Sequence, residues 1–172
     1  MGARSKSLLW IETIHMSLVH GFHLLATSLF SPADYSNWPP DTEGVQIHDD
    51  LRGYMWDALA WVECLYPHAG MKTVFGPDVY GPSVVTTHGA STLARVLDGY
   101  ANVFSSGPEL LRLNCGPFWD AGDHADRTVE KMQWRFAEFS RDETVCRLRK
   151  IANAAQTALA APHDWFIAIR GI

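Results

Sequence analysis

Two histidines three residues apart, His20 and His23, have a spacing that could hold one metal ion. If residues 8–30 form a helix, both imidazoles lie on its polar side, which Glu12 shares three turns away. A catalytic zinc takes three protein ligands, and the run His48-Asp49-Asp50 could supply the third. Such a site would make the chain a metal-dependent enzyme. The simpler interpretation, which the sequence favours, is that both histidines are ordinary polar-face residues and that no metal or other cofactor is bound.

A second group of chemically capable residues lies in the segment Trp119-Asp120-Ala121-Gly122-Asp123-His124-Ala125-Asp126. Three carboxylates and an imidazole could bind a cation, but their spacing departs from the calcium-binding Asp-x-Asp-x-Asp-Gly loop. The sequence favours a polar loop in which Asp123 or Asp126 caps a following helix. Cys115 and His88 could act as nucleophile and base, yet nothing in the sequence places them together.

The motifs that define the common enzyme classes are absent from the sequence. It contains no phosphate-binding Gly-x-x-x-x-Gly-Lys loop, no Gly-x-Gly-x-x-Gly fingerprint, no His-Glu-x-x-His, no Gly-x-Ser-x-Gly and no Ser-x-x-Lys. A non-enzymatic protein is therefore favoured, and no catalytic residue is predicted.

The outer side of a predicted helix over residues 49–66 offers a surface for a partner. Asp50, Tyr54, Asp57 and Trp61 fall within about 60° of one another on the helical wheel, opposite the apolar stripe. Exposed aromatic rings flanked by carboxylates are typical of interfaces that receive basic residues. The predicted partner-binding residues are Asp49, Asp50, Tyr54, Trp56, Asp57, Trp61 and Glu63. The alternative is that this helix is buried on two sides and that Trp61 and Tyr54 pack in the core.

Charge is distributed unevenly along the chain. Residues 7–126 hold 14 acidic side chains and 4 basic ones, whereas residues 127–172 hold 8 basic and 5 acidic ones. An acidic body repels phosphate, so the pattern indicates a basic protein partner and no nucleic acid. Arg127, Lys131 and Arg135 form a basic stripe on a predicted helix, which is either solvated or available for self-association as a homo-oligomer.

The compartment is predicted from cysteine usage and hydropathy. The three cysteines, Cys64, Cys115 and Cys146, are widely spaced and odd in number, which favours reduced thiols in the cytoplasm. Glu12 and three histidines interrupt the apolar stretch 8–30, so neither a membrane span nor a signal peptide is expected.

The elements expected to position these residues make an α+β fold of about five helices with three or four short strands, in one compact domain spanning residues 1–172. Residues 1–7 are expected to be a flexible N-terminus and residues 31–47 a surface loop. Helices are predicted over 8–30, from Asp49 or Asp50 to Tyr66, from Ser91 to about Gly107, around Val129, Met132, Phe136 and Phe139, and after the capping box Ser140-Arg141-Asp142-Glu143. Strands are predicted over 72–75, 84–87 and 164–170; residues 109–114 read as a strand or one helical turn, and 116–122 as a loop.

The overall profile is similar to one functional group of proteins, although no motif assigns the chain to a family. Small, acidic, tryptophan-rich and motif-free domains resemble the immunity proteins that neutralise bacterial toxins, many of which cover basic nuclease sites with acidic surfaces. The resemblance is compositional. It implies an inhibitor that blocks a cationic partner with the outer face of the 49–66 helix and the adjacent loop.

Overall fold

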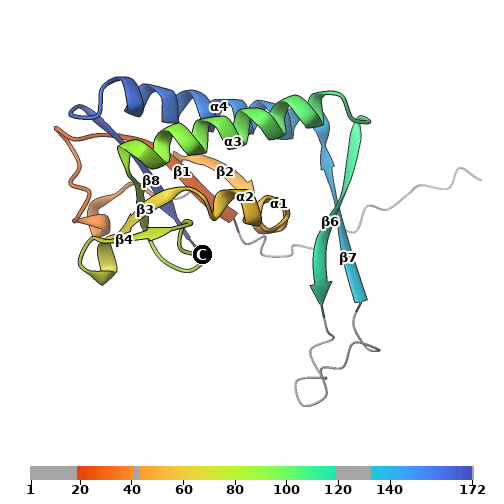
Figure 1. Cartoon of the computed structure of the whole chain (residues 1–172), viewed down its shortest axis with the longest axis horizontal. Coiled ribbons are helices and arrows are strands. Elements are labelled where there is room, and N and C mark those ends of the chain that lie inside the picture. The colour runs from red at the N-terminus through yellow and green to blue at the C-terminus, as the bar shows by residue number, and fades with distance from the viewer. Residues whose placement is uncertain (1–18, 41–42, 119–132, 172) are drawn as a thin grey trace, which may run out of the picture.

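The computed structural model describes residues 19–40, 43–118 and 133–171 (Figure 1). Within them, six strands form an antiparallel sheet in the order β2-β1-β8-β5-β3-β4. These strands are β1 (Val19–Ala26), β2 (Val45–His48), β3 (Glu63–Tyr66), β4 (Lys72–Phe75), β5 (Ser83–Val85) and β8 (Trp165–Arg170). The predicted α+β class is confirmed, but the described residues hold more strands and fewer helices than expected.

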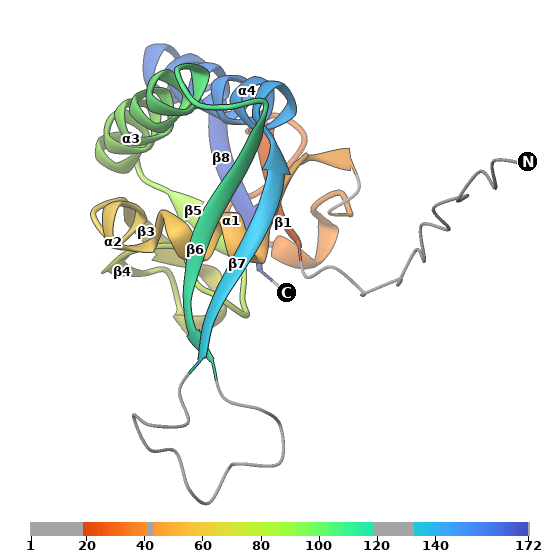
Figure 2. The ribbon, with the colours of Figure 1, turned by 90° about the vertical axis from the view of Figure 1, so that its right-hand side faces the viewer.

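Two long helices, α3 (Thr87–Ser105) and α4 (Arg141–Ala160), pack side by side over one face of this sheet (Figure 1). Two short helices, α1 (Asp49–Tyr54) and α2 (Trp56–Leu59), connect β2 to β3. Two short 3-10 helices, η1 (Tyr35–Asn37) and η3 (Pro67–Ala69), lie in connecting segments. Strands β6 (Leu110–Phe118) and β7 (Gln133–Ser140) form a separate ribbon that projects from the body (Figures 1 and 2). No helix in the described part of the chain is both long and apolar enough to cross a membrane.

The closing strand predicted over residues 164–170 is confirmed as β8, which lies inside the sheet. Ile167 and Ile169 belong to the core beneath the helices. Phe166 faces the other side of the sheet, where its ring lies 6.0 Å from that of Trp38 in the 27–44 segment. Because both faces of β8 are covered, its sequence is a short continuous apolar run, and this run is what predicted a strand here.

The helix predicted over residues 8–30 is wrong where the structure describes it, because residues 19–26 form β1. β1 lies between β2 and β8, with Phe22 in the core beneath the helices and Leu25 in the cluster on the opposite face. Apolar residues on both faces erase the two-residue period of a strand and leave a pattern that also fits a helix. Residues 8–18 lie outside the described part, as do residues 1–7.

The helix predicted around Phe136 and Phe139 is also wrong, since residues 133–140 form β7. A spacing of three puts these two rings on opposite faces of a strand. Phe136 is exposed, whereas Phe139 packs against the core. Val129 and Met132, together with Arg127 and Lys131 of the predicted basic stripe, lie outside the described residues.

The helix predicted from Asp49 or Asp50 to Tyr66 is right only in its first part. Its cap is His48, whose Nδ1 accepts a hydrogen bond from the backbone N–H of Asp50 at 3.0 Å. The helix breaks at Met55, and β3 occupies residues 63–66. The apolar stripe Leu51, Met55, Leu59 and Val62 is nonetheless buried, because both short helices turn the same side to the core.

Several other expectations are confirmed or adjusted at their boundaries. The 72–75 strand is β4, the 84–87 strand is β5 at 83–85, and the strand alternative for 109–114 is β6, which extends into the predicted 116–122 loop. The 31–47 loop ends early, at β2. α3 begins four residues before Ser91 because Thr86 caps it, and Ser140 caps α4 as the capping box predicts.

Candidate functional site

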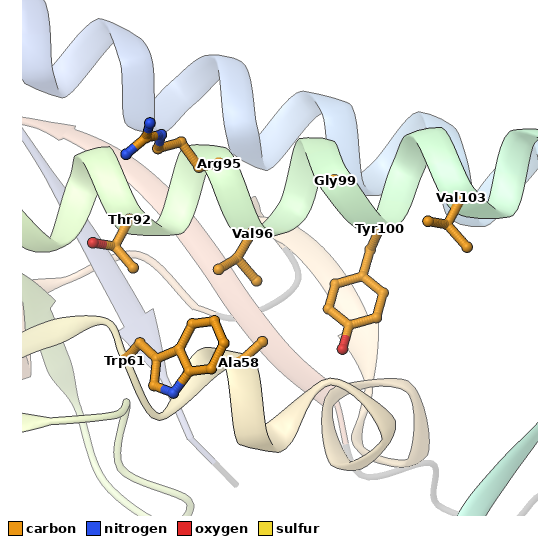
Figure 3. Close-up of a pocket in the computed structure, with 8 residues that line it drawn as sticks. All are labelled: Ala58, Trp61, Thr92, Arg95, Val96, Gly99, Tyr100 and Val103. Atoms are coloured by element: carbon orange, nitrogen blue, oxygen red, sulfur yellow. The ribbon is translucent and has the colours of Figure 1, made fainter.

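An open groove of about 540 Å³ runs between α2 and α3 (Figure 3). Its lining is mostly apolar and consists of Ala58, Trp61, Thr92, Arg95, Val96, Gly99, Tyr100 and Val103. On α3, the positions 92, 96, 99 and 103 recur at helical spacing and form one stripe, which faces α2. This stripe is separate from the buried one that holds α3 on the sheet, Leu93, Leu97, Ala101 and Phe104.

Small residues keep the groove open. A Cβ atom added at Gly99 would meet no atom within 4 Å outside the helix's own backbone. Ala58 stands opposite on α2, with Trp61 beside it (Figure 3). A methyl group can therefore be added at Gly99 without displacing any described part of the fold.

An aromatic cluster borders the groove at Tyr100. The Tyr54 ring lies 6.1 Å from that of Tyr100 in an edge-to-face arrangement, and both rings lie within 6.0 Å of buried Phe104. Burial raises the pKa of the Tyr100 hydroxyl, and the nearby Tyr54 and Asp57 raise it further. The exposed Asp57 carboxylate is thus close enough to act electrostatically on the groove wall.

Four of the seven predicted partner-binding residues are exposed. Trp61 is 66% exposed, Tyr54 39% and Trp56 37%, and Asp57 is also exposed. Trp61 lines the groove, and Tyr54 and Asp57 adjoin it through Tyr100. Trp56 lies elsewhere, with the Arg52 guanidinium 4.9 Å above its ring and Gly76 beside it.

The other three predicted partner-binding residues are engaged inside the molecule. Asp49 accepts hydrogen bonds from buried Arg52, and Asp50 forms an ion pair with Arg135 of β7. Glu63 accepts a hydrogen bond of 2.7 Å from the hydroxyl of Thr86. The acidic character of the 49–66 segment is therefore partly neutralised by contacts that the helical wheel could not indicate.

His20 and His23 do not face one ion, because they lie on a strand and not on a helix. Three residues apart on β1, their side chains point to opposite faces of the sheet. His20 is fully buried, with its Nε2 2.9 Å from Oδ1 of Asp49, whereas His23 lies beside Gly44. Among the residues that the structure describes, no group of three or more metal-binding side chains is close enough to hold an ion.

The His20–Asp49–Arg52 network joins β1 to α1. Burial alone would raise the pKa of the Asp49 carboxyl, but the hydrogen bond from His20 and the charge and hydrogen bond of Arg52 outweigh it, and the pKa is lowered. Because His20 is inaccessible, the network stabilises the fold and does not present a reactive imidazole to solvent.

Cys115 and His88, the candidate nucleophile and base, do not lie together. Burial raises the pKa of the Cys115 thiol, with a further rise from the charge of Asp50. His88 lies in the first turn of α3, and Cys115 lies on β6 beyond the other end of that helix, which is about 28 Å long. The 119–126 cluster, with Asp123 and Asp126, lies outside the described residues.

Sequence reasoning missed the α3 half of the groove. The sequence predicted a helix over this stretch but assigned no partner-binding role to Val96, Tyr100 or Val103, of which Tyr100 is only partly buried. The second stripe at Thr92, Val96, Gly99 and Val103 was the available signal. It was missed because a stripe of valine, threonine and glycine has little hydrophobic contrast with the core stripe beside it.

No protein-family model, no curated protein and no solved structure matches the chain.

Proposed function

We propose that this chain is a non-enzymatic binding protein that docks a basic protein partner on the groove between α2 and α3. In its sharpest form the role is that of an immunity protein that blocks a bacterial toxin. The observation that carries the proposal is Trp61, 66% exposed and set in an apolar groove whose opposite wall is α3. A large ring left in water beside such a groove is typical of interface hot spots.

The aromatic walls support binding through a side chain of the partner. Tyr54, Tyr100 and Phe104 brace one another, so Tyr100 stands in a fixed position and loses little conformational freedom on binding. An apolar side chain of the partner would fill the space over Gly99 and Ala58.

The charge that supports a cationic partner is Asp57, which lies beside the groove, whereas the charged residue in the groove lining is Arg95. Asp57 is exposed and within electrostatic reach of Tyr100, and no ion pair within the described residues engages it. A lysine or arginine of the partner that lies over the Tyr54 and Tyr100 rings would meet both the carboxylate and the ring faces. Arg95 lines the groove nearer Thr92 and away from Val103, where an acidic or carbonyl group of the partner would pair with it (Figure 3).

The test is capture from the native cell extract on immobilised protein, followed by binding measurements with the purified partner. We expect a stoichiometric basic protein that is lost with Trp61→Ala and retained with Leu29→Ala, which removes an even more exposed apolar residue outside the groove. Asp57→Lys should weaken binding more than tenfold, which is about 1.4 kcal/mol. Equal capture by Trp61→Ala would refute the groove as the docking surface.

The toxin-immunity role also requires that the partner be toxic. Expression of the captured protein alone should arrest bacterial growth, and coexpression of this chain should restore it. Coexpression of the Trp61→Ala variant should fail to do so. A partner without toxicity would leave the binding role standing and remove the immunity role.

A further inference from the structure

The β6–β7 ribbon has one face on the body and one face in solvent. Leu111 and Leu113 are buried on the inner face, which packs against α1, and Arg135 on the same face pairs with Asp50. The strand register places Arg112 opposite Glu138 and Asn114 opposite Phe136 on the outer face. Within the described residues, each of the two strands pairs only with the other.

The outer face exposes more apolar surface than a two-stranded ribbon can stabilise by itself. Trp134 is 55% exposed, Leu110 53% and Phe136 49%. A hairpin of two strands is marginal in water unless another layer covers its apolar face. The ribbon stands away from the main sheet (Figure 1), and within the described residues these side chains of its outer face are exposed.

Charge on this face indicates what covers it. The Arg112 guanidinium lies 4.7 Å from the centre of the Phe136 ring, and Glu138 is its neighbour on the adjacent strand. Neither residue forms an ion pair within the described part of the chain, and both are exposed. One charge of each sign, side by side across the ribbon, makes the face complementary to itself under a two-fold rotation.

We propose that the outer face of the β6–β7 ribbon is a dimerisation surface whose partner is a second copy of this chain. A two-fold axis parallel to the strands, between β6 and β7, places each Arg112 opposite Glu138 of the second copy. The two ribbons then stack face to face about 10 Å apart, with Trp134 and Phe136 enclosed between them. This surface is separate from the groove, so it is independent of the proposed function.

Complementation between two charge variants tests this arrangement. Arg112→Glu alone and Glu138→Arg alone each place like charges across the axis, so each protein should be monomeric where the wild type is dimeric. An equimolar mixture should form a heterodimer, because both cross-axis pairs are then attractive. Sedimentation equilibrium between 1 and 100 µM, on samples of native circular dichroism, measures the masses.

Two further proteins complete the test. Trp134→Ser should weaken the dimer at least tenfold, whereas Trp61→Ala, equally aromatic but on the groove, should leave it unchanged. The proposal is overturned if the wild type sediments as a monomer at 100 µM, even if some other protein binds the ribbon. It is also overturned if the mixture of charge variants gains no mass over either variant alone.

Discussion

At the residue scale, the Asp49 carboxylate holds β1 and α1 together through His20 and Arg52. Asp49→Ala should lower the free energy of unfolding at pH 7 by about 1–3 kcal/mol, because it leaves two buried donors without their acceptor. Urea unfolding measures the loss. The control is Asp142→Ala, which removes an exposed carboxylate paired with its neighbour Arg141 and should cost less than about 0.5 kcal/mol.

The lowered pKa of Asp49 predicts that its contribution to stability depends on pH. The native pKa of Asp49 lies below its ordinary value of 3.8, so its contribution is complete above about pH 5 and is lost as the pH falls through the native pKa. The stability gap between wild type and Asp49→Ala should therefore narrow from pH 5 to pH 3. A gap that stays constant over that range would show that the carboxylate charge does not stabilise the fold.

The cysteines differ in predicted reactivity. Burial, with a smaller effect from Glu63, raises the pKa of Cys64 to about 12, whereas Cys146 is exposed on α4. At pH 8, iodoacetamide should modify Cys146 within minutes and reach Cys64 only after unfolding, because the thiolate is the reactive form. Peptide mapping by mass spectrometry distinguishes the two sites. Modification of both at similar rates in native protein would contradict the burial of Cys64.

At the element scale, two glycines in α3 have opposite roles. A Cβ atom at Gly89 would lie 2.0 Å from the carbonyl oxygen of Glu63, whereas one at Gly99 meets nothing outside the helix. Gly89→Ala should therefore destabilise the fold by about 1–3 kcal/mol or more, because the backbone at Glu63 or in α3 must move. Gly99→Ala should stabilise it by about 0.5–1 kcal/mol through helix propensity. Thermal and urea unfolding report both, and a destabilising Gly99→Ala would show that the groove is narrower than described.

The two long helices could be predicted from the sequence because each has one exposed face. α3 and α4 are amphipathic and have hydroxyl caps, Thr86 and Ser140, so their period and starts can be read locally. β1 and β7 could not be read in this way. β1 is apolar on both faces because the sheet is covered on both sides, and β7 carries aromatic residues on both faces of a ribbon.

Only one wall of the groove could be predicted from the sequence, because the other wall comes from a distant part of the chain. Trp61, Tyr54 and Asp57 belong to one short segment, so a helical wheel grouped them despite the break at Met55. The opposite wall comes from α3, some thirty to forty residues later, and its approach depends on how both helices pack on the sheet. Likewise, the pairing of Asp50 with Arg135 joins residues 85 apart in sequence. Local pattern contains no information on such contacts.

At the scale of the whole molecule, we expect the attraction of a basic partner to depend less on the net charge than on the position of the unpaired charges. The chain carries a formal charge of −5, yet Asp49 and Asp50 are neutralised within the fold. Asp57 is the carboxylate left beside the groove. Binding of a basic partner should therefore weaken with salt, and Asp57→Asn should flatten that dependence. A salt dependence that is unchanged in Asp57→Asn would place the electrostatic contact elsewhere on the acidic body.

The affinity of the captured partner for Gly99→Phe relative to Gly99→Ala tests the central claim most directly. Both variants should keep the fold, because a Cβ atom at Gly99 meets no atom within 4 Å outside the helix's own backbone, but only phenylalanine is large enough to fill the groove. Circular dichroism of both variants checks that they are folded. If the groove between α2 and α3 is the docking surface, Gly99→Phe should bind at least tenfold more weakly than Gly99→Ala. Equal affinities would show that the partner binds another surface.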